Sequence, residues 1–307
     1  MARREIRAVT VLTNPASGHG NAPHAAERAI ARFQQRGVDV IEIVGTDAEH
    51  ARRLVDDALD RGTDALVVAG GDGIISVALQ ALALGDVPLG VIPAGTGNDH
   101  AREYRLPTGD PEAAADVVAD GWAENVDLGR IVNRDGVTKW FGTVMAAGFD
   151  SLVTDRTNRM RWPHGRMRYN LAMVAELSKL RLLPFRMTFD DGDEIATDLT
   201  LAAFGNTRSY GGGMLICPDA DHGDGQLDIT MVHSASRTRL IRLFPTVFKG
   251  THVDLDEVTT ARAKSVGVDS PGINAYADGE FVCALPVRVS AVPAALHILC
   301  PNGQTGA

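Results

Sequence analysis

A glycine-rich turn between a strand-like run and a helix-like run constrains the fold more than any other feature of the sequence. Residues 65–69 read Ala-Leu-Val-Val-Ala, typical of a buried strand, and Gly70, Gly71, Asp72 and Gly73 follow directly. Residues 74–84 are an apolar run of helical length. Glycines let the backbone approach phosphate oxygens, and the N-terminus of a helix offers unpaired N–H groups. The turn predicts a phosphate-binding site, with an ordinary tight turn as the alternative.

Asp72 adds a metal ion to this prediction. Its carboxylate would repel a phosphate at the turn if nothing lay between the two negative groups. A divalent cation that bridges carboxylate and phosphate, usually through water molecules, removes this repulsion. The turn therefore predicts a site for a nucleotide together with its metal ion.

Two more polar turns with glycines follow strand-like runs. Residues 89–94 lead into Gly-Thr-Gly-Asn-Asp at 95–99, and residues 8–13 lead into Asn-Pro-Ala-Ser-Gly-His-Gly at 14–20. In an open α/β sheet, ligands bind in the crevice at the carboxyl ends of the strands. We expect the three turns to line one such crevice.

The first part of the chain, residues 6–127, alternates strand-like and helix-like runs. Helices are expected at 22–37 and 47–61, with a strand at 38–44 between them. Such alternation predicts a parallel sheet with helices on its faces. Thr46, at the end of that strand, is either the N-cap of the second helix or a ligand contact.

The second part of the chain, residues 128–291, has short extended runs separated by turn residues, which predicts a β-rich domain. One helix is expected at 167–183. We expect residues 292–307 to return to the first domain, residues 1–127. The extended runs of the second part are 140–147, 185–189, 199–205, 227–232, 263–268, 274–277 and 287–291, and the returning segment contains one more at 295–299.

Composition and charge narrow the class of protein. The chain has 307 residues, a net charge of −9 and a pI near 5.5, which argue against a nucleic-acid-binding protein. No apolar run reaches the roughly 20 residues that cross a bilayer, and the N-terminus does not resemble a signal peptide. A cytoplasmic protein is expected. Cys217, Cys283 and Cys300 are widely spaced, so neither a disulfide framework nor a zinc site is expected.

Several motifs, in one order along the chain, resemble those of a known family. They are Asn14-Pro15-x-Ser17-Gly18, Gly70-Gly71-Asp72-Gly73, Pro93-x-Gly95-Thr96-x-Asn98-Asp99, Phe204-Gly205-Asn206, Gly211-Gly212-Gly213, Pro218-x-Ala220, Asp224-Gly225-x-Leu227-Asp228 and Asp278-Gly279-Glu280. The chain resembles the lipid kinases that include soluble bacterial diacylglycerol kinases, sphingosine kinases and ceramide kinases. Residues 93–128 and 162–165 look most like the actinobacterial diacylglycerol kinases.

The resemblance implies a fold and an activity. The implied fold is a nucleotide-binding α/β domain, similar to phosphofructokinase and NAD kinase, joined to a C-terminal β-sandwich with the active site between them. The implied activity is transfer of the γ-phosphate of ATP to the hydroxyl of diacylglycerol, which gives phosphatidic acid for phospholipid metabolism. Sphingoid bases, monoacylglycerol and glycolipids stay open as acceptors.

The resemblance also implies roles for single residues. Glu280 is implied as the general base, and Asp278 as the residue that organises the metal or the base. Asp72 and Asp99 are implied in a water-linked network around the catalytic Mg²⁺. The residues implied to hold ATP are Asn14, Ser17, Gly18, Thr46, Gly70, Gly71, Gly73 and Thr96, together with Asp72.

The Asp278–Glu280 segment has two readings from its sequence. If it is extended, both side chains point to the same face, which suits a joint role. Because Asp-Gly is a common turn pair, the alternative is a surface turn.

A second metal site is implied in the loop of residues 221–226. The family places Mg²⁺ on two carboxylates and a backbone carbonyl, which match Asp221, Asp224 and the carbonyl of Gln226. Oxygen ligands on a tight loop suit Mg²⁺. The alternative is a solvated turn.

The chain departs from the family pattern after the first glycine turn. Ile74 and Val77 stand where the family has threonine and glutamate. We expect an active enzyme with altered nucleotide contacts. The alternatives are an NAD kinase-like enzyme, which shares the Gly-Gly-Asp-Gly turn, and a nucleotide- or lipid-binding regulator with weakened catalysis.

A basic segment predicts contact with an anionic membrane surface. Each basic residue near such a surface contributes about 1 kcal/mol, and the expected location is the inner face of the membrane, with peripheral association. The alternative is a charged outer face over a buried helix, and a homodimer is left open. The segment contains Arg156, Arg159, Arg161, Arg166, Arg168, Lys179, Arg181 and Arg186.

Overall fold

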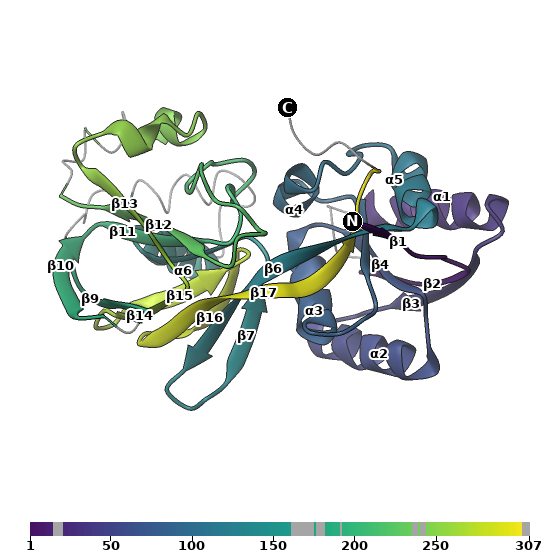
Figure 1. Cartoon of the computed structure of the whole chain (residues 1–307), viewed down its shortest axis with the longest axis horizontal. Helices are drawn as coiled ribbons and strands as arrows, with labels where there is room; N and C mark the ends of the chain where they lie inside the picture. Colours follow the sequence, from purple (N-terminus) through teal and green to yellow (C-terminus); the bar gives the residue numbers. More distant parts are fainter. Residues whose placement is uncertain are drawn as a thin grey trace.

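The structure is a computed structural model that describes residues 1–14, 21–160, 175, 182–190, 192–234, 239 and 244–302. Two lobes lie side by side, and the long strands β6 (Trp122–Asn133) and β17 (Val287–Leu299) run through both of them (Figure 1). We call them the α/β lobe and the sandwich lobe. The predicted combination of an α/β unit with a β-rich unit is confirmed.

The α/β lobe is built on a parallel sheet with the strand order β5-β4-β2-β3. Its strands match four of the predicted runs within one residue at each end. They are β2 (Ala8–Thr13), β3 (Asp39–Val44), β4 (Ala65–Gly70) and β5 (Leu89–Pro93). β4 and β5 are buried along their whole length, as expected for central strands covered on both faces.

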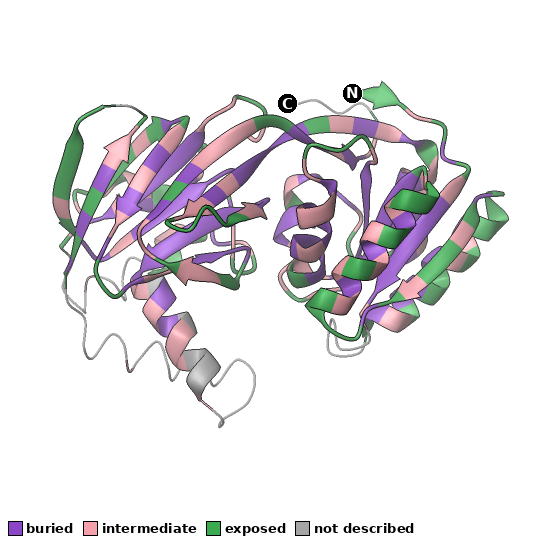
Figure 2. Cartoon of the chain, turned by 90° about the horizontal axis from the view of Figure 1, so that it is seen from below, coloured by how far each residue is buried: buried purple, intermediate pink, exposed green. Residues whose placement is uncertain are grey.

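Helices cover both faces of this sheet. Because successive side chains of a strand point to opposite faces, alternate residues pack against different helices. Leu66 and Val68 of β4 pack with α2 (Ala48–Arg61) and α3 (Asp72–Leu82). Ala65 and Val67 pack with α1 (Asn21–Gln35) and α5 (Pro111–Asp120) on the other face. In Figure 2 the central strands of this sheet appear buried between the helices.

The sandwich lobe packs the remaining part of the first sheet against a second, antiparallel sheet. Buried side chains such as Phe185 and Phe204 fill the space between the two. The first sheet continues through β6, β7 (Thr138–Phe141), β9 (Leu183–Phe189), β10 (Glu194–Leu199), β14 (Ser265–Asp269) and β17, and β1 (Ala2–Arg3) pairs with β6. The second sheet contains β8 (Val144–Gly148), β11 (Leu201–Gly205), β12 (Leu227–Val232), β13 (Val258–Ala263), β15 (Asn274–Ala277) and β16 (Glu280–Ala284).

The two C-terminal runs that the sequence predicts at 287–291 and 295–299 are one strand, β17. Its pairing with β6 shifts register between Val292 and Leu296, and Ile298 then pairs in parallel with Leu89 of β5. The chain therefore does return to the α/β lobe. The predicted boundary between residues 127 and 128 falls inside β6. The domain limits themselves stay a prediction.

Shorter elements complete the described part of the chain. α4 (Asp99–Glu103) follows β5, α6 (Phe149–Arg159) follows β8, and the 3₁₀ helix η2 (Thr251–Asp254) precedes β13. Most of the predicted helix at 167–183 lies outside the described residues. Within this range the structure describes only Ala175 and residues 182 and 183. Leu183 begins β9 instead of ending a helix. Among the described residues, no helix has the length and hydrophobicity of a membrane span.

Candidate active site

The residues predicted to hold ATP follow the carboxyl ends of neighbouring parallel strands. Asn14 follows β2, Thr46 lies two residues after β3, Gly70 ends β4, and Thr96 follows β5. Because these strands are parallel and in register, the residues lie at one edge of the sheet. Ser17 and Gly18 lie outside the described residues. The predicted grouping of turns is thus seen for every member that the structure describes.

The turns after β4 and β5 touch each other through their backbones. A side-chain carbon on Gly95 would lie 2.4 Å from the Cα atom of Gly71, and one on Gly71 would lie 3.0 Å from the Cα atom of Gly95. The Asn98 side chain fixes the second turn, because it accepts from the N–H of Gly95 at 3.0 Å and donates to the carbonyl of Gly95 at 2.9 Å. Glycine is therefore required at both positions by packing.

Asp72 begins α3, and its carboxylate is held by His100 of α4. The Nδ1 atom of His100 lies 3.0 Å from Oδ1 of Asp72, and the backbone N–H of His100 donates to the same oxygen at 3.3 Å. Burial acts to raise the pKa of Asp72, but the hydrogen bond and the charge of the His100 ring outweigh it and lower this pKa to about 2. Asp72 is ionised at neutral pH, and hard carboxylate oxygens are the donors that Mg²⁺ prefers.

His100 is the member of this site that sequence reasoning missed. It is 2 % exposed. Burial acts to lower its pKa, but the hydrogen bond to Asp72 and the negative charges of Asp278, Asp72 and Asp99 raise it above its ordinary value. The only sequence signal was its position directly after Asn98 and Asp99 of the third motif. A histidine at such a position can be a ligand or a core residue, and the sequence does not distinguish the two.

Asp99 holds a loop of the sandwich lobe. Its carboxylate accepts from the N–H groups of Gly212 and Gly213 at 2.7 and 2.8 Å, and from the Ser209 hydroxyl at 3.1 Å. Arg102 also donates to it at 2.7 Å. Asp99 is predicted to join the Mg²⁺ network, and this stays a prediction. Through these hydrogen bonds Asp99 also joins α4 to the loop of Gly211, Gly212 and Gly213, which we call the glycine loop.

The Asp278–Glu280 segment is a turn, so the reading as an extended segment is wrong. Ala277 pairs with Glu280, and Asp278 and Gly279 between them have φ angles of +50° and +79°. Two positive φ angles in a two-residue loop define a type I′ hairpin, for which Asp-Gly is a preferred pair. The two carboxylates therefore do not project from one face of a strand.

Asp278 is nevertheless buried, unlike the Asp of a surface turn. It is 7 % exposed and accepts three hydrogen bonds: from the N–H of Gly142 at 3.0 Å, the N–H of Thr143 at 2.8 Å and the hydroxyl of Thr143 at 2.6 Å. Asn206 in turn donates to the carbonyl of Gly142 at 3.0 Å. Asp278 thus anchors the hairpin to the segment between β7 and β8.

Glu280, the predicted base, is exposed and reaches across to the α/β lobe. A side-chain carbon placed on Gly73 would lie 3.5 Å from Oε1 of Glu280. Gly97 lies against the other carboxylates, because a carbon on it would lie 2.8 Å from Oδ2 of Asp72 and 3.5 Å from Oδ2 of Asp99. The two glycine turns and the hairpin therefore bring a base candidate to the N-terminus of α3.

Two smaller expectations are decided by local structure. Thr46 is not the N-cap of α2, because Asp47 holds that position and its side chain accepts from the N–H of His50 at 2.8 Å. Thr46 is exposed, and its role as an ATP contact stays a prediction.

Ile74 is 5 % exposed in the core of the α/β lobe, and Val77 packs against the same core. Both departures from the family pattern therefore serve packing.

In the predicted metal loop at 221–226, backbone N–H groups and an arginine bind the two carboxylates that are expected to hold the metal. Asp221 accepts from the N–H of Gly223 at 3.0 Å, and Asp224 accepts from the N–H of Gln226 at 2.9 Å. Asp224 also forms a close ion pair with Arg262, which competes with a metal for that carboxylate. Among the described residues, no three His, Cys, Asp or Glu side chains converge on a metal position, but the prediction uses only two carboxylates and a carbonyl.

Several carboxylates lie around this loop, and the Arg262 guanidinium pairs with Asp228 at 3.3 Å as well as with Asp224. Burial and the negative charges of Asp219 and Asp221 raise the pKa of Asp228 to about 6. Asp127 fixes the loop from β6, because it accepts from the N–H of Gly225 at 2.7 Å and from the N–H of Ala294 at 2.8 Å. The loop is thus attached to both β6 and β17, and a cation there would relieve the repulsion between its carboxylates.

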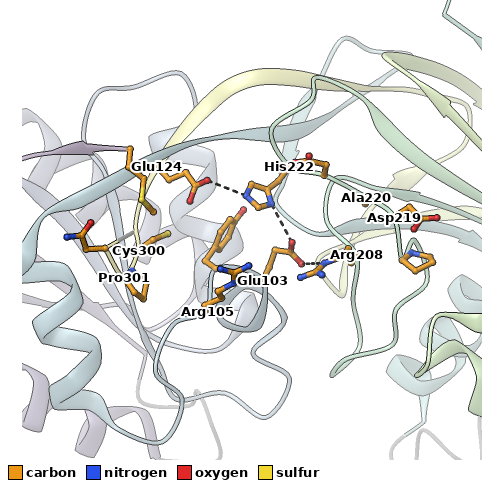
Figure 3. A pocket seen from close by; sticks show the side chains of 14 residues that line it. Glu103, Arg105, Glu124, Arg208, Asp219, Ala220, His222, Cys300 and Pro301 are labelled. Carbon is orange, nitrogen blue, oxygen red and sulfur yellow. Dashed lines mark hydrogen bonds and ion pairs between the residues drawn. The ribbon is translucent and has the colours of Figure 1, made fainter. Parts of the chain in front are cut away.

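A cavity of about 740 Å³ lies beside this loop (Figure 3). His222 stands between two glutamates in it, with Nδ1 3.4 Å from Oε1 of Glu103 and Nε2 3.9 Å from Oε1 of Glu124. The Glu103 carboxylate raises the pKa of His222. Arg208 completes the cluster at 3.3 Å from Glu103. None of the predicted catalytic residues Glu280, Asp278, Asp72 and Asp99 lines the cavity, whereas Asp221 of the predicted metal loop does.

Two family models match the chain in sequence order. The model of the diacylglycerol kinase catalytic domain matches residues 8–131, and that of the YegS C-terminal NAD kinase beta sandwich-like domain matches residues 143–300. A diacylglycerol kinase from Mycobacterium tuberculosis is 67% identical over 302 residues, which are 98% of each chain. The predicted family resemblance is confirmed by both findings.

Solved structures share the fold. The crystal structure of a putative diacylglycerol kinase from Bacillus anthracis superposes with a TM-score of 0.79 at 20% identity, and covers 98% of this chain and 97% of its own. An NAD kinase from Archaeoglobus fulgidus superposes with a TM-score of 0.53 at 13% identity, over 95% of this chain and 93% of its own. The predicted likeness to the NAD kinase fold is thus confirmed. With two family models and a close relative over its whole length, the chain belongs to the diacylglycerol kinase family.

Proposed function

We propose that the protein transfers the γ-phosphate of ATP to the free hydroxyl of diacylglycerol, with phosphatidic acid as the product. One observation carries the proposal: the carboxylate of Glu280 lies beside Gly73, at the N-terminus of the helix that follows the glycine turn. That is where the family relationship and the backbone chemistry expect the phosphates of ATP. A base and a phosphate site in one place are the requirements of a kinase.

The α/β lobe supplies the nucleotide site. The N–H groups at the start of α3 and the positive end of its dipole attract phosphate oxygens. Asn14, Thr46, Gly70, Gly71 and Thr96 are proposed to hold ATP along the edge of the sheet, with Ser17 and Gly18 as further contacts. Positioning of the γ-phosphate in line with the acceptor contributes most of the rate in such reactions.

The hairpin supplies the base. Glu280 is proposed to accept the proton of the lipid hydroxyl while the hydroxyl oxygen forms its bond to the γ-phosphorus and the bond from that phosphorus to the β–γ bridging oxygen breaks. ADP leaves with the electrons of the broken bond. Asp278 acts through the backbone, because its buried hydrogen bonds hold the turn that precedes Glu280.

Mg²⁺ is the metal ion whose chemistry these residues fit. Asp72, ionised and next to Gly97, is proposed to hold the hydrated ion, which neutralises charge on the transferring phosphate. Asp99 is proposed as a second member of this network. A separate Mg²⁺ on Asp221, Asp224 and the carbonyl of Gln226 is proposed to have a structural role.

The acceptor lies in a membrane, so the protein is proposed to associate peripherally with the inner membrane face. Support comes from the basic segment between Arg156 and Arg186 in a chain whose net charge is −9. Most of this segment lies outside the described residues, and Arg186 is exposed on β9. The sequence leaves a homodimer open, and sedimentation of the protein alone measures the oligomeric state.

Transfer of labelled γ-phosphate tests the proposal. The protein is incubated with Mg²⁺, labelled ATP and, in separate reactions, diacylglycerol, monoacylglycerol, a sphingoid base and NAD. Label in diacylglycerol, with the Glu280→Gln variant as the blank, is the expected result. Preferential labelling of NAD would favour the NAD kinase alternative, and no labelling of any acceptor would favour the regulator.

A further inference from the structure

The imidazole of His100 touches both halves of the candidate active site. On one side Nδ1 lies 3.0 Å from Oδ1 of Asp72. On the other side the ring packs against the backbone of Gly142, where a side-chain carbon would come within 2.4 Å of Nε2 and 2.9 Å of Cδ2. Only glycine leaves room for the ring at that position.

Gly142 in turn belongs to the support of the predicted base. Its N–H donates to Oδ2 of Asp278 at 3.0 Å, and Asp278 holds the hairpin turn that leads into Glu280. The ring therefore lies between the carboxylate at the start of α3 and the backbone that anchors the hairpin. Asp72 belongs to the α/β lobe, and Asp278 belongs to the sandwich lobe.

A core role does not account for the chemistry of this side chain. His100 is 2 % exposed, and its Nε2 atom has no hydrogen-bond partner among the described residues. A buried polar atom without a partner is unfavourable, and an aromatic hydrocarbon ring would fill similar space without that penalty. The nitrogen on the other side of the ring, which binds Asp72, is the part that an apolar ring cannot replace.

We propose that His100 is a positioning residue of the phosphoryl-transfer site, which orients the Asp72 carboxylate toward the hydrated Mg²⁺ and fixes its spacing from the Asp278–Gly279–Glu280 hairpin. This inference rests on the proposed function. The Nδ1–H group and the backbone N–H of His100 together hold Oδ1 of Asp72, so Oδ2 is left facing Gly97. The oxygen next to Gly97 is then the one available to the metal ion.

Three variants and a matched control test the proposal. His100→Phe keeps a ring and removes both nitrogens, whereas His100→Asn keeps a donor near the position of Nδ1. Asp72→Asn provides the partner for a double-mutant cycle. His252→Phe is the control, because His252 is 1 % exposed and also has one bonded and one unpartnered ring nitrogen, with Nε2 3.0 Å from the carbonyl of Ile216.

We expect His100→Phe to lower kcat roughly ten- to a hundredfold, the scale of one lost hydrogen bond to a charged group, and to raise the Mg²⁺ concentration for half-maximal activity. KM for the lipid should not change. His100→Asn should restore the Mg²⁺ dependence, and His252→Phe should keep it. If His100 acts through Asp72, the double variant His100→Phe/Asp72→Asn is no worse than Asp72→Asn alone.

Calorimetric titration of each variant with ATP, with and without Mg²⁺, gives a readout that does not need turnover. We expect the gain in ATP affinity from Mg²⁺ to shrink in His100→Phe and to return in His100→Asn. Should the wild type phosphorylate no acceptor, the proposed function fails, and this titration still decides on His100. A wild-type response of His100→Phe in both assays, or additive losses in the cycle, would overturn the proposal. If His100→Phe does not fold, His100→Leu, which also lacks the donor to Asp72, takes its place in the same assays with the same expected losses.

Discussion

Thr143 donates both its backbone N–H and its hydroxyl to the same carboxylate oxygen of Asp278, at 2.8 and 2.6 Å. The two residues are 135 positions apart in the chain, and both are buried. This contact joins the turn of the β15–β16 hairpin to the start of β8. The carboxylate that looks like part of a turn in the sequence is an anchor in the folded protein.

Thr143→Val tests this anchor, because valine keeps the shape and the backbone N–H but removes the hydroxyl. A hydrogen bond to a charged group contributes about 1.5–3 kcal/mol, so the free energy of unfolding should fall by about that amount. Activity should fall as well, since the hairpin carries Glu280. Denaturant titration and turnover measure the two effects. Thr143→Ser keeps the donor and should stay close to wild type; equal losses in both variants would assign the effect to packing.

Glu280→Gln should abolish phosphorylation of the lipid and leave ATP affinity almost unchanged. The amide keeps the size of the side chain but cannot accept the proton of the hydroxyl, and a general base contributes roughly 10²–10⁴-fold to the rate. Turnover and calorimetric ATP binding are the measurements. Retention of more than about a third of the wild-type turnover, far above that range, would remove Glu280 from the role of base.

Asp221→Ala should lower thermal stability as well as activity if the loop of residues 221–226 binds a structural metal ion. A ligand that binds only the folded state stabilises it, so the wild type should melt at a higher temperature with Mg²⁺ than with a chelator. The variant should lose that difference. Equal melting temperatures of wild type and variant in saturating Mg²⁺ would argue that this loop holds no metal.

Asp116→Asn should weaken the attachment of α1 to α5, and its effect on stability should disappear at low pH. Arg32 and Arg36 both pair with Asp116, at 2.8 Å each, and the hydrogen bond from Arg32 is the main cause of its lowered pKa. A lowered pKa means that the stabilisation is present above the unfolded pKa of 3.8 and is lost as the pH falls through the folded pKa.

The expected loss for Asp116→Asn at pH 7 is at most about 1 kcal/mol, as for other surface ion pairs. Thermal melts of wild type and variant should converge once the pH falls through the folded pKa of Asp116, which lies below 3.8, and in 1 M salt, since the charges are then neutralised or screened. A difference that persists under both conditions would mean that the substitution acts through helix packing and not through charge.

Replacement of Arg159, Arg161, Arg166 and Arg168 by Gln should weaken binding to vesicles that contain anionic lipid, by about 1 kcal/mol per charge near the surface. Binding of the wild type should also fall with salt, because screening acts over about 8 Å at physiological ionic strength. Activity on a short-chain, water-soluble diacylglycerol should survive. Co-sedimentation with vesicles at low and high salt decides; wild-type binding by the quadruple variant would place the docking surface elsewhere.

Local features of the sequence were enough to predict the α/β lobe. Strands β2, β4 and β5 are apolar runs, and each one ends in a turn whose glycines or polar residues are adjacent in the chain. Such signals need only short-range chemistry: burial on both faces selects apolar residues, and a close backbone approach selects glycine, as at Gly71 and Gly95. The sandwich was predicted as a class, but its strand pairing was not.

The sequence did not predict features that depend on contacts between segments far apart in the chain. Residues 287–299 look like two short runs because Pro293 and Ala294 interrupt them, yet β17 stays one strand since β6 pairs with it on both sides of the interruption. The Asp278–Gly279 turn was weighed as a surface feature because its partners, Gly142 and Thr143, lie far away in the chain.

The sequence by itself therefore determined the parallel sheet, the glycine turns and the family, because each depends on residues within one element or one motif. Only the tertiary structure decided that Asp278 is an anchor, that Asp99 holds the glycine loop at Gly212 and that His100 lies between the Asp72 carboxylate and the backbone of Gly142. The physical reason is burial: a carboxylate or an imidazole has its chemical character set by the groups that surround it, and those groups come from both lobes.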